Sequence, residues 1–220
     1  MNRNNINGNP DEREKNRKLT EAEQKRMERF EMIAEELSGR GYRRTDLTIS
    51  IVNANIFAIF LLIPLAVIGA LLFYIRHRTL AAGLGSYSLL YMAVAFLILI
   101  VIHELIHGAS WAIFTERHFR DIEFGFMKQY FTPYCTCVVP LSKGPYIFGA
   151  LTPLILLGIV PMIIGILIGS MPVLIVGILM ADAASGDIMI VWNILRYRSE
   201  AENVVYMDHP TQAGGVIFKK

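Results

Sequence analysis

Long apolar runs separated by short polar segments dominate the chain from residue 47 onwards. Each of four runs is long enough to supply the roughly 20 helical residues that cross a bilayer. The predicted spanning helices are 56–75, at the core of an apolar stretch that begins at 47, then 87–114, 146–169 and 172–195. Pro153 and Pro161 predict a bend in the third helix, because proline removes a backbone hydrogen bond.

The segment before these runs is polar and has two parts. Residues 1–19 contain almost nothing to bury, which predicts disorder. Thr20 and Glu23 then form a capping-box pattern, and apolar residues follow at helical spacing as far as Leu37. We therefore expect an amphipathic helix and a linker within residues 20–46. The helix is expected to lie on a membrane surface or on the protein's own cytoplasmic side, rather than to serve as a partner-binding arm.

Period-two alternation of apolar and polar residues indicates two strand-forming segments. Residues 121–141 alternate on two arms, with Phe124 on the first arm and Cys135 and Cys137 on the second. This pattern predicts a β-hairpin at the cytoplasmic membrane surface. The tail, residues 196–220, contains NVVYM, a DHP turn and GGVIF, which favour a further short strand pair.

The predicted fold class is an α-helical membrane protein with about four transmembrane helices, a short cytoplasmic β-hairpin and an N-terminal amphipathic helix. Residues 47–195 form its membrane-embedded core. Orientation follows from the basic residues, because Lys and Arg concentrate in cytoplasmic loops. The opposite loops contain only Arg76 and Arg78. The basic residues that flank the spans on the predicted cytoplasmic side are Arg40, Arg43, Arg44, Arg117, Arg120, Lys128, Lys143, Arg196 and Arg198. Both termini are therefore expected to be cytoplasmic.

Composition agrees with this class of protein. The chain is 54% hydrophobic and only 18% charged, which is less charged than a typical soluble domain. Residues 1–46 hold 11 of the 21 Lys and Arg residues, so the rest of the chain is even more apolar than this average suggests. The net charge of +2 gives no reason to expect a nucleic-acid partner.

The second apolar run, LILIVIHELIHGAS at 97–110, contains ionisable side chains, which are rare in membrane helices and usually functional there. His103 and His107 are spaced to lie on one helix face, so both imidazoles can reach one metal ion. Glu104, about 100° around the helix from His103, can address a water on that ion. This H-E-x-x-H spacing predicts a zinc site with Glu104 as general base. The alternative is a pair of buried, hydrogen-bonded histidines.

Zinc needs at least one more protein ligand and an open position. The remaining carboxylates of the apolar body are Asp182 and Asp187. Asp187 and His107 lie eight and seven residues from the predicted cytoplasmic ends of their helices. At 1.5 Å per residue both lie at a depth of about 10–12 Å, which favours Asp187 as the third ligand. Gly186 is expected to permit close helix approach.

The other polar residues are expected to have supporting roles. Asp182 lies about 140° from Asp187 on one continuous helix, which favours a packing or supporting hydrogen bond over metal ligation. Asn193 is a further structural or supporting candidate. Cys135 and Cys137 share one face of the predicted strand. Three roles are open to them: metal ligands, redox-sensitive thiols or, most simply, small apolar side chains that fill space in the core.

These segments together resemble a known family. HELIHG in an apolar run, Pro-Tyr-Cys-Thr-Cys leading into PLS, SGDIMIVWNIL and a late DHP turn resemble the zincin peptidases, small bacterial membrane proteins similar in plan to site-2 protease intramembrane metalloproteases. The resemblance covers roughly residues 40–218. It implies His103, His107 and Asp187 as zinc ligands and Glu104 as catalytic base. The chain departs from well-known site-2 proteases in having SGD where they carry an Asn-Pro…Asp-Gly arrangement, and it leaves no room for a PDZ domain.

The predicted function is a zinc-dependent intramembrane metalloprotease of the bacterial cytoplasmic membrane, where the lipid bilayer surrounds it. Its expected substrate is a membrane protein or transmembrane peptide cut near the cytoplasmic side. A non-catalytic membrane protein with a structural metal site, acting as a partner or regulator, and a metal transporter are the alternatives. Glu104 favours the enzyme, while transport predicts a polar relay that 146–169 lacks. The strand-like segment 131–139 is expected either to pair with an unwound substrate or to close the cytoplasmic mouth.

Overall fold

The computed structural model describes residues 19–127, 132–199, 201 and 203–220. This part of the chain is mostly helical and includes two small antiparallel sheets. The segment predicted to be disordered, residues 1–19, lies outside the described residues apart from Leu19.

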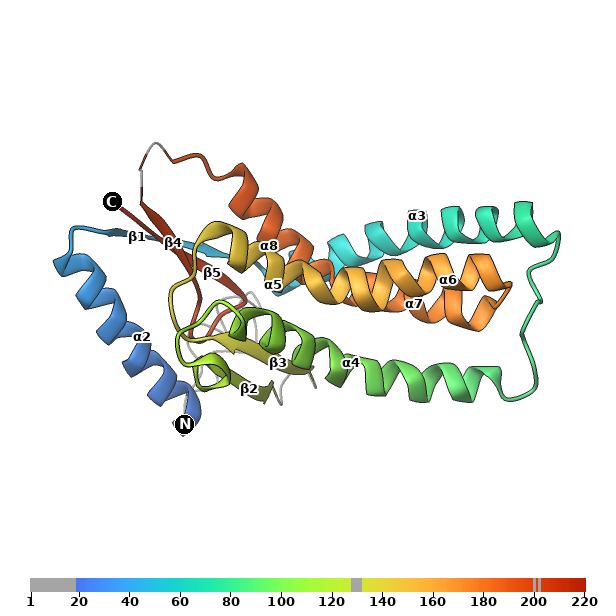
Figure 1. The fold of residues 1–220 in the computed structure, drawn as a ribbon, viewed down its shortest axis with the longest axis horizontal. Coiled ribbons are helices and arrows are strands. Elements are labelled where there is room, and N and C mark those ends of the chain that lie inside the picture. The colour runs from blue at the N-terminus through green and yellow to red at the C-terminus, as the bar shows by residue number, and fades with distance from the viewer. Residues whose placement is uncertain (1–18, 128–131, 200, 202) are drawn as a thin grey trace, which may run out of the picture.

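The apolar runs form helices. Three are long and apolar enough to cross a membrane, and a bent pair is a fourth candidate. The bounds are α3 (Ile51–His77), α4 (Ser88–Ala112), α5 (Lys143–Pro153) continued by η2 (Leu154–Ile159) and α6 (Val160–Ile168), and the pair α7 (Met171–Ala183) and α8 (Ser185–Arg196). In Figure 1 the connections from α3 to α4 and from α6 to α7 lie at one end of the molecule, and the strands lie at the other.

The fourth apolar segment is not the single helix predicted for residues 172–195. It breaks at Ala184, where α7 and α8 are bent by 47° relative to each other. Asp187 falls in the first turn of α8, so the angle expected between it and Asp182 on one continuous helix does not apply. In the third segment, Pro153 is followed by six residues of π-helix, a local rearrangement that accommodates the backbone donor missing at proline.

Close helix packing occurs at other glycines than the one predicted. A Cβ at Gly186 would meet no described atom within 4 Å, so this residue does not mediate close helix approach. A Cβ at Gly165 would lie 2.9 Å from the Cα of Leu174, and one at Gly158 would lie 2.9 Å from the Cα of Ala181. These two glycines therefore allow the η2–α6 segment to pack directly against the backbone of α7.

The C-terminal strand pair is present and belongs to a larger sheet. β4 (Val204–Asp208) and β5 (Gly214–Lys219) are antiparallel, and β1 (Arg43–Thr48) pairs with the other side of β5. The segment that forms β1 was predicted to be a linker, and its mostly exposed, polar sequence RRTDLT is typical of an edge strand. This sheet joins the two ends of the described chain.

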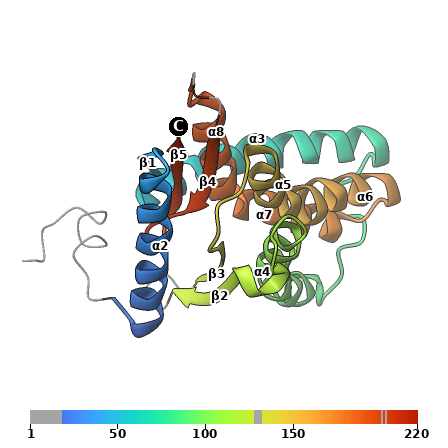
Figure 2. The same ribbon diagram turned by 60° about the vertical axis from the view of Figure 1, so that its left-hand side comes forward.

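The amphipathic helix α2 (Glu21–Gly39) covers this sheet, with its N-terminus held by the predicted capping box of Thr20 and Glu23. Phe30, which is 2% exposed, packs in one cluster with Val216 and Phe218 of β5. Figure 2 shows α2 running alongside the sheet towards the hairpin. Of the two predicted placements, the structure therefore has the one on the protein itself.

The predicted hairpin consists of β2 (Ile122–Met127) and β3 (Thr132–Cys137), which follow the short helix η1 (His118–Asp121). It packs against α4 at Gly108, where a Cβ would lie 3.0 Å from the Cγ2 of Ile122. Arg26 and Arg29 of α2 form salt bridges with Glu123 at 3.0 Å and Asp121 at 3.2 Å. The hairpin is thus fixed between α4 and α2.

Candidate metal centre

Three side chains from two helices converge on one point. His103 and His107 lie one turn apart on α4, and Asp187 comes from the first turn of α8. The Oδ2 of Asp187 is 3.2 Å from the Nε2 of His103 and 3.4 Å from the Nε2 of His107, and the two Nε2 atoms are 3.0 Å apart. The break at Ala184 places Asp187 at the start of α8. The tertiary fold thereby adds a third candidate ligand to the two histidines of α4.

Helix α5 sets the orientation of His107. The Nδ1 of His107 lies 2.8 Å from the carbonyl oxygen of Gly149, an acceptor, so the proton of the neutral ring is assigned to Nδ1. The Nε2 lone pair then faces Asp187, as in a metal-ligating histidine. The indole of Trp111 stacks on this imidazole at 5.2 Å between ring centroids, and its Nε1 donates to the carbonyl of Tyr146 at 3.1 Å.

The donor set fits zinc. Two imidazole nitrogens and a carboxylate oxygen are typical zinc ligands. Zinc–ligand bonds of about 2.0–2.1 Å in tetrahedral geometry place ligand atoms about 3.3–3.4 Å apart, close to the 3.0–3.4 Å seen among His103, His107 and Asp187. Two imidazole lone pairs at 3.0 Å repel each other unless a cation or a proton lies between them. The cluster therefore has the chemistry and the spacing of a metal site.

Glu104 lies in the same cleft without belonging to this cluster. The cleft has a volume of about 300 Å³, and Glu104, His107 and Asp187 all line it. Its walls come from α4, β3, α5, α8 and the loop between β4 and β5. A carboxylate beside three converging ligands, facing an open volume, is the arrangement expected for a general base acting on a water at the metal.

The edge of β3 that faces the cleft has few free backbone donors. The N–H of Cys137 donates to the Oδ2 of Asp208 at 2.9 Å, and the backbone of Cys135 interacts with the Glu104 carboxylate. Pro133, the next residue on the same edge, has no N–H. Substrate pairing along this edge would have to displace both carboxylates. The geometry therefore favours the alternative in which the hairpin closes the mouth of the cleft.

The predicted cysteine candidates lie apart from the metal cluster. Cys135 lines the cleft, whereas Cys137 is 1% exposed and its thiol donates to the carbonyl of Val139 at 3.5 Å. Burial raises the pKa of both thiols, to about 12 for Cys137. Neither thiol belongs to the group of described ligand atoms that converge, which are those of His103, His107 and Asp187. The apolar-packing role fits Cys137 best.

The remaining two candidates, Asp182 and Asn193, lie away from the cleft. Asp182 was expected to form a supporting hydrogen bond, but its Oδ1 is buried with no partner among the described residues. Asn193 lies nearly two turns beyond Asp187, and its backbone carbonyl accepts from the N–H of Tyr197 at 2.9 Å. Neither Asp182 nor Asn193 is among the described residues that line the cleft.

The buried carboxylate of Asp208, in the late DHP turn, connects three walls of the cleft by hydrogen bonds. The sequence analysis did not predict this role. The carboxylate accepts hydrogen bonds from the hydroxyl of Tyr146 at 2.5 Å and from the N–H of Cys137. Burial raises the pKa of Asp208, an effect that these hydrogen bonds partly offset. Asp208 thus joins the C-terminal sheet to α5 and β3. The DHP segment contributed to the family resemblance, but nothing in its local pattern indicated this long-range contact.

Comparison with protein families gives a match to part of the chain. Residues 96–201 match the protein family described as "Putative zincin peptidase". This segment contains His103, Glu104, His107 and Asp187, so the whole candidate centre falls within the match. The resemblance to the zincin peptidases is confirmed over these residues, and the description of the family indicates a metallopeptidase. No curated protein and no solved structure matches the chain.

Proposed function

We propose that this protein is a zinc metallopeptidase that cleaves a membrane protein or transmembrane peptide near the cytoplasmic side of the bilayer. One observation carries the proposal: His103, His107 and Asp187 converge on one point, and His107 and Asp187 line a cleft together with Glu104. Structural zinc sites are closed by four protein ligands, whereas catalytic sites keep one position open. The described residues supply three ligands and a carboxylate suited to act as a base, which favours catalysis over a structural or regulatory metal site.

The chain's own residues have distinct tasks in peptide hydrolysis. Zinc held by the two histidines and Asp187 would supply Lewis acidity, which polarises a peptide carbonyl and acidifies water. Glu104 accepts the proton of the attacking water and passes it to the leaving amine. Gly149 holds His107 with its Nε2 towards Asp187. Trp111 packs on the far side of that imidazole and shields it from solvent.

Exposed apolar surface supports the membrane setting of this proposal. Phe60 of α3 is 71% exposed, Leu89 of α4 is 80% exposed and Ile168 of α6 is 66% exposed. Exposed apolar area on this scale indicates contact with lipid. The basic Arg43, Lys143 and Arg198 lie at the end of the molecule that carries the sheet, as the proposed cytoplasmic orientation requires.

Comparison of the wild type with Glu104→Gln tests the proposal. The full chain is purified in a neutral detergent, its zinc is measured by mass spectrometry, and its cleavage of a panel of single-span peptides is followed. Glutamine keeps the size of the side chain but cannot accept the proton. We expect zinc in both proteins and a loss of cleavage of about 10²- to 10⁴-fold in the variant. Zinc in both proteins with equal cleavage, or with no cleavage by either, would contradict the proposal.

A further inference from the structure

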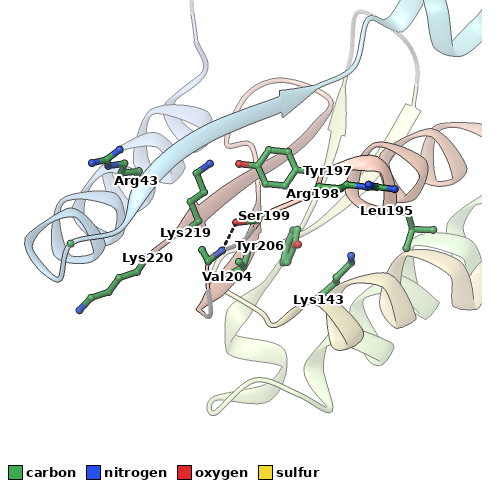
Figure 3. A pocket seen from close by; sticks show the side chains of 12 residues that line it. Arg43, Lys143, Leu195, Tyr197, Arg198, Ser199, Val204, Tyr206, Lys219 and Lys220 are labelled. Carbon is green, nitrogen blue, oxygen red and sulfur yellow. Dashed lines mark hydrogen bonds between the residues drawn. The ribbon is translucent and has the colours of Figure 1, made fainter.

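A second, basic cavity lies at the end of the molecule that carries the sheet. It has a volume of about 1230 Å³ and is formed by β1, the start of α5, the end of α8 with residues 197–199 and 201, β4 and β5 (Figure 3). The basic side chains that line it are those of Arg43, Lys143, Arg198, Lys219 and Lys220. No carboxylate side chain is among the lining residues within the described part of the chain.

Among the described residues, these cations have no carboxylate partner, unlike neighbouring cations. On the adjoining elements, Arg26 and Arg29 of α2 and Arg44 of β1 all form salt bridges with carboxylates. None of the salt bridges between described residues includes a cation of the basic cavity. Lys219 instead lies over the ring of Tyr197, 5.4 Å from its centroid. Like charges gathered around a hollow create a positive potential that favours an anion.

The surroundings of the cavity are those of a membrane interface. Leu195, which lines it, is 55% exposed, and the nearby Trp192 is 58% exposed. The guanidinium of Arg196 lies over the Trp192 ring, 5.6 Å from its centroid. Exposed tryptophan with basic residues at the end of an apolar helix is typical of the level of lipid headgroups. Figure 3 shows Lys143 and Arg198 on the side of the basic cavity where Leu195 lies.

We propose that the basic cavity is a binding site for a negatively charged phosphate group, as presented by an anionic phospholipid headgroup or by a soluble phosphate. Arginine offers paired donors and lysine a point charge, and both commonly bind phosphate oxygens. The basic cavity shares no lining residue with the metal-centre cleft, so this site is separate from the proposed peptidase centre. Two of the helices that form the basic cavity, α5 and α8, nevertheless also contribute Gly149 and Asp187 to the metal centre.

Calorimetric titration of the full chain in neutral detergent tests this site. The probes are dioctanoyl phosphatidylglycerol, dioctanoyl phosphatidylcholine as the zwitterionic control, and inorganic phosphate. The pocket variant is Lys143→Gln/Arg198→Gln, which changes two exposed side chains. The matched control is Lys25→Gln/Arg120→Gln, which removes two exposed cations outside the cavity. A charge-retaining variant, Lys143→Arg/Arg198→Lys, tests whether charge at these positions restores binding.

We expect saturable binding of the anionic lipid, weakened about 25-fold in the pocket variant, about fivefold for each cation removed. The control should bind like the wild type, and the charge-retaining variant should recover most of the affinity. Binding that inorganic phosphate does not displace assigns the site to lipid, whereas saturable binding of inorganic phosphate with the same dependence on the variants assigns it to a soluble phosphate. Absence of saturable binding by either anion, or equal losses in the pocket and control variants, would overturn the proposal.

Discussion

The carbonyl oxygen of Gly149 lies 2.8 Å from the Nδ1 of His107, and this contact joins α5 to the metal centre on α4. It determines that the Nε2 of His107 is the nitrogen that faces Asp187, at 3.4 Å from the carboxylate. Gly149 also provides the space in which Trp111 stacks on His107, because a Cβ at this position would overlap the indole ring. One residue without a side chain therefore supports the ligand in two ways.

Gly149→Ala should weaken zinc binding although no ligand is changed. The new methyl group must displace Trp111, which disturbs the packing that orients His107. We expect a decrease in zinc affinity of about 10- to 100-fold, as is typical when ligand-orienting contacts are lost, and a loss of about 1–3 kcal/mol in the free energy of unfolding. Chelator competition and thermal unfolding measure the two effects. Gly144→Ala on the same helix, where a Cβ meets nothing within 4 Å, is the control; identical behaviour of the two variants would contradict this role of Gly149.

Asp187→Ala and Asp182→Ala should differ in zinc content. Asp187 lies within reach of both Nε2 atoms, whereas Asp182 is not part of the cluster. We expect the zinc affinity of Asp187→Ala to fall by at least about tenfold, since a ligand should matter no less than the groups that orient it. Asp182→Ala should keep its zinc. The zinc content of each variant is measured after dialysis against a weak chelator. Loss of zinc from Asp182→Ala but not from Asp187→Ala would show that the wrong aspartate is assigned as a ligand.

Removal of the metal should destabilise the fold through the same residues. A ligand that binds only the folded state adds about 2.7 kcal/mol to the free energy of unfolding at a concentration 100 times its dissociation constant. A strong chelator should therefore lower the thermal unfolding midpoint of the wild type. Asp187→Ala, which lacks the third ligand, should show a much smaller change. A chelator effect of the same size in both proteins would place the responsible metal elsewhere.

The cysteine thiols should be unreactive in the folded protein. Burial raises the pKa of Cys137 to about 12 and also raises the pKa of Cys135, so both are neutral thiols near pH 8. Because the thiolate is the nucleophile, alkylation by iodoacetamide should be slower by more than about 100-fold than in the denatured chain. Peptide mass spectrometry reports each cysteine separately. Rapid labelling of Cys137 before unfolding would show that it is not packed as described.

Asp208 should make stability depend on pH. Burial raises its pKa in the folded state above the ordinary value of 3.8. A group of this kind contributes stability that is fully present below the unfolded-state pKa and is lost as the pH rises through the folded-state pKa. Asp208→Asn cannot undergo this loss, so its unfolding midpoint should improve relative to the wild type as the pH rises above about 4, the ordinary pKa of an aspartate. A difference between the two midpoints that stays constant above this pH would contradict the shift.

Local spacing by itself determined half of the metal centre. His103, Glu104 and His107 need only the period of one helix to place two imidazoles on one face and a carboxylate beside them. The length of the apolar runs similarly predicted three helices that are long enough to cross a membrane, and the capping box at Thr20 predicted where α2 begins. These features depend on residues within one or two turns of each other, which is why the sequence alone was sufficient.

Contacts between distant segments were decided only by the tertiary structure. The break at Ala184 positions Asp187 in the first turn of α8, and the carbonyl of Gly149 orients His107 from another helix. The strand that begins at Arg43 pairs with the strand that ends at Lys219, although all of the long apolar helices lie between them in the sequence. None of these contacts has a local pattern, because each depends on which apolar faces bury one another when the whole chain packs. The basic cavity, built from five separate elements, exists for the same reason.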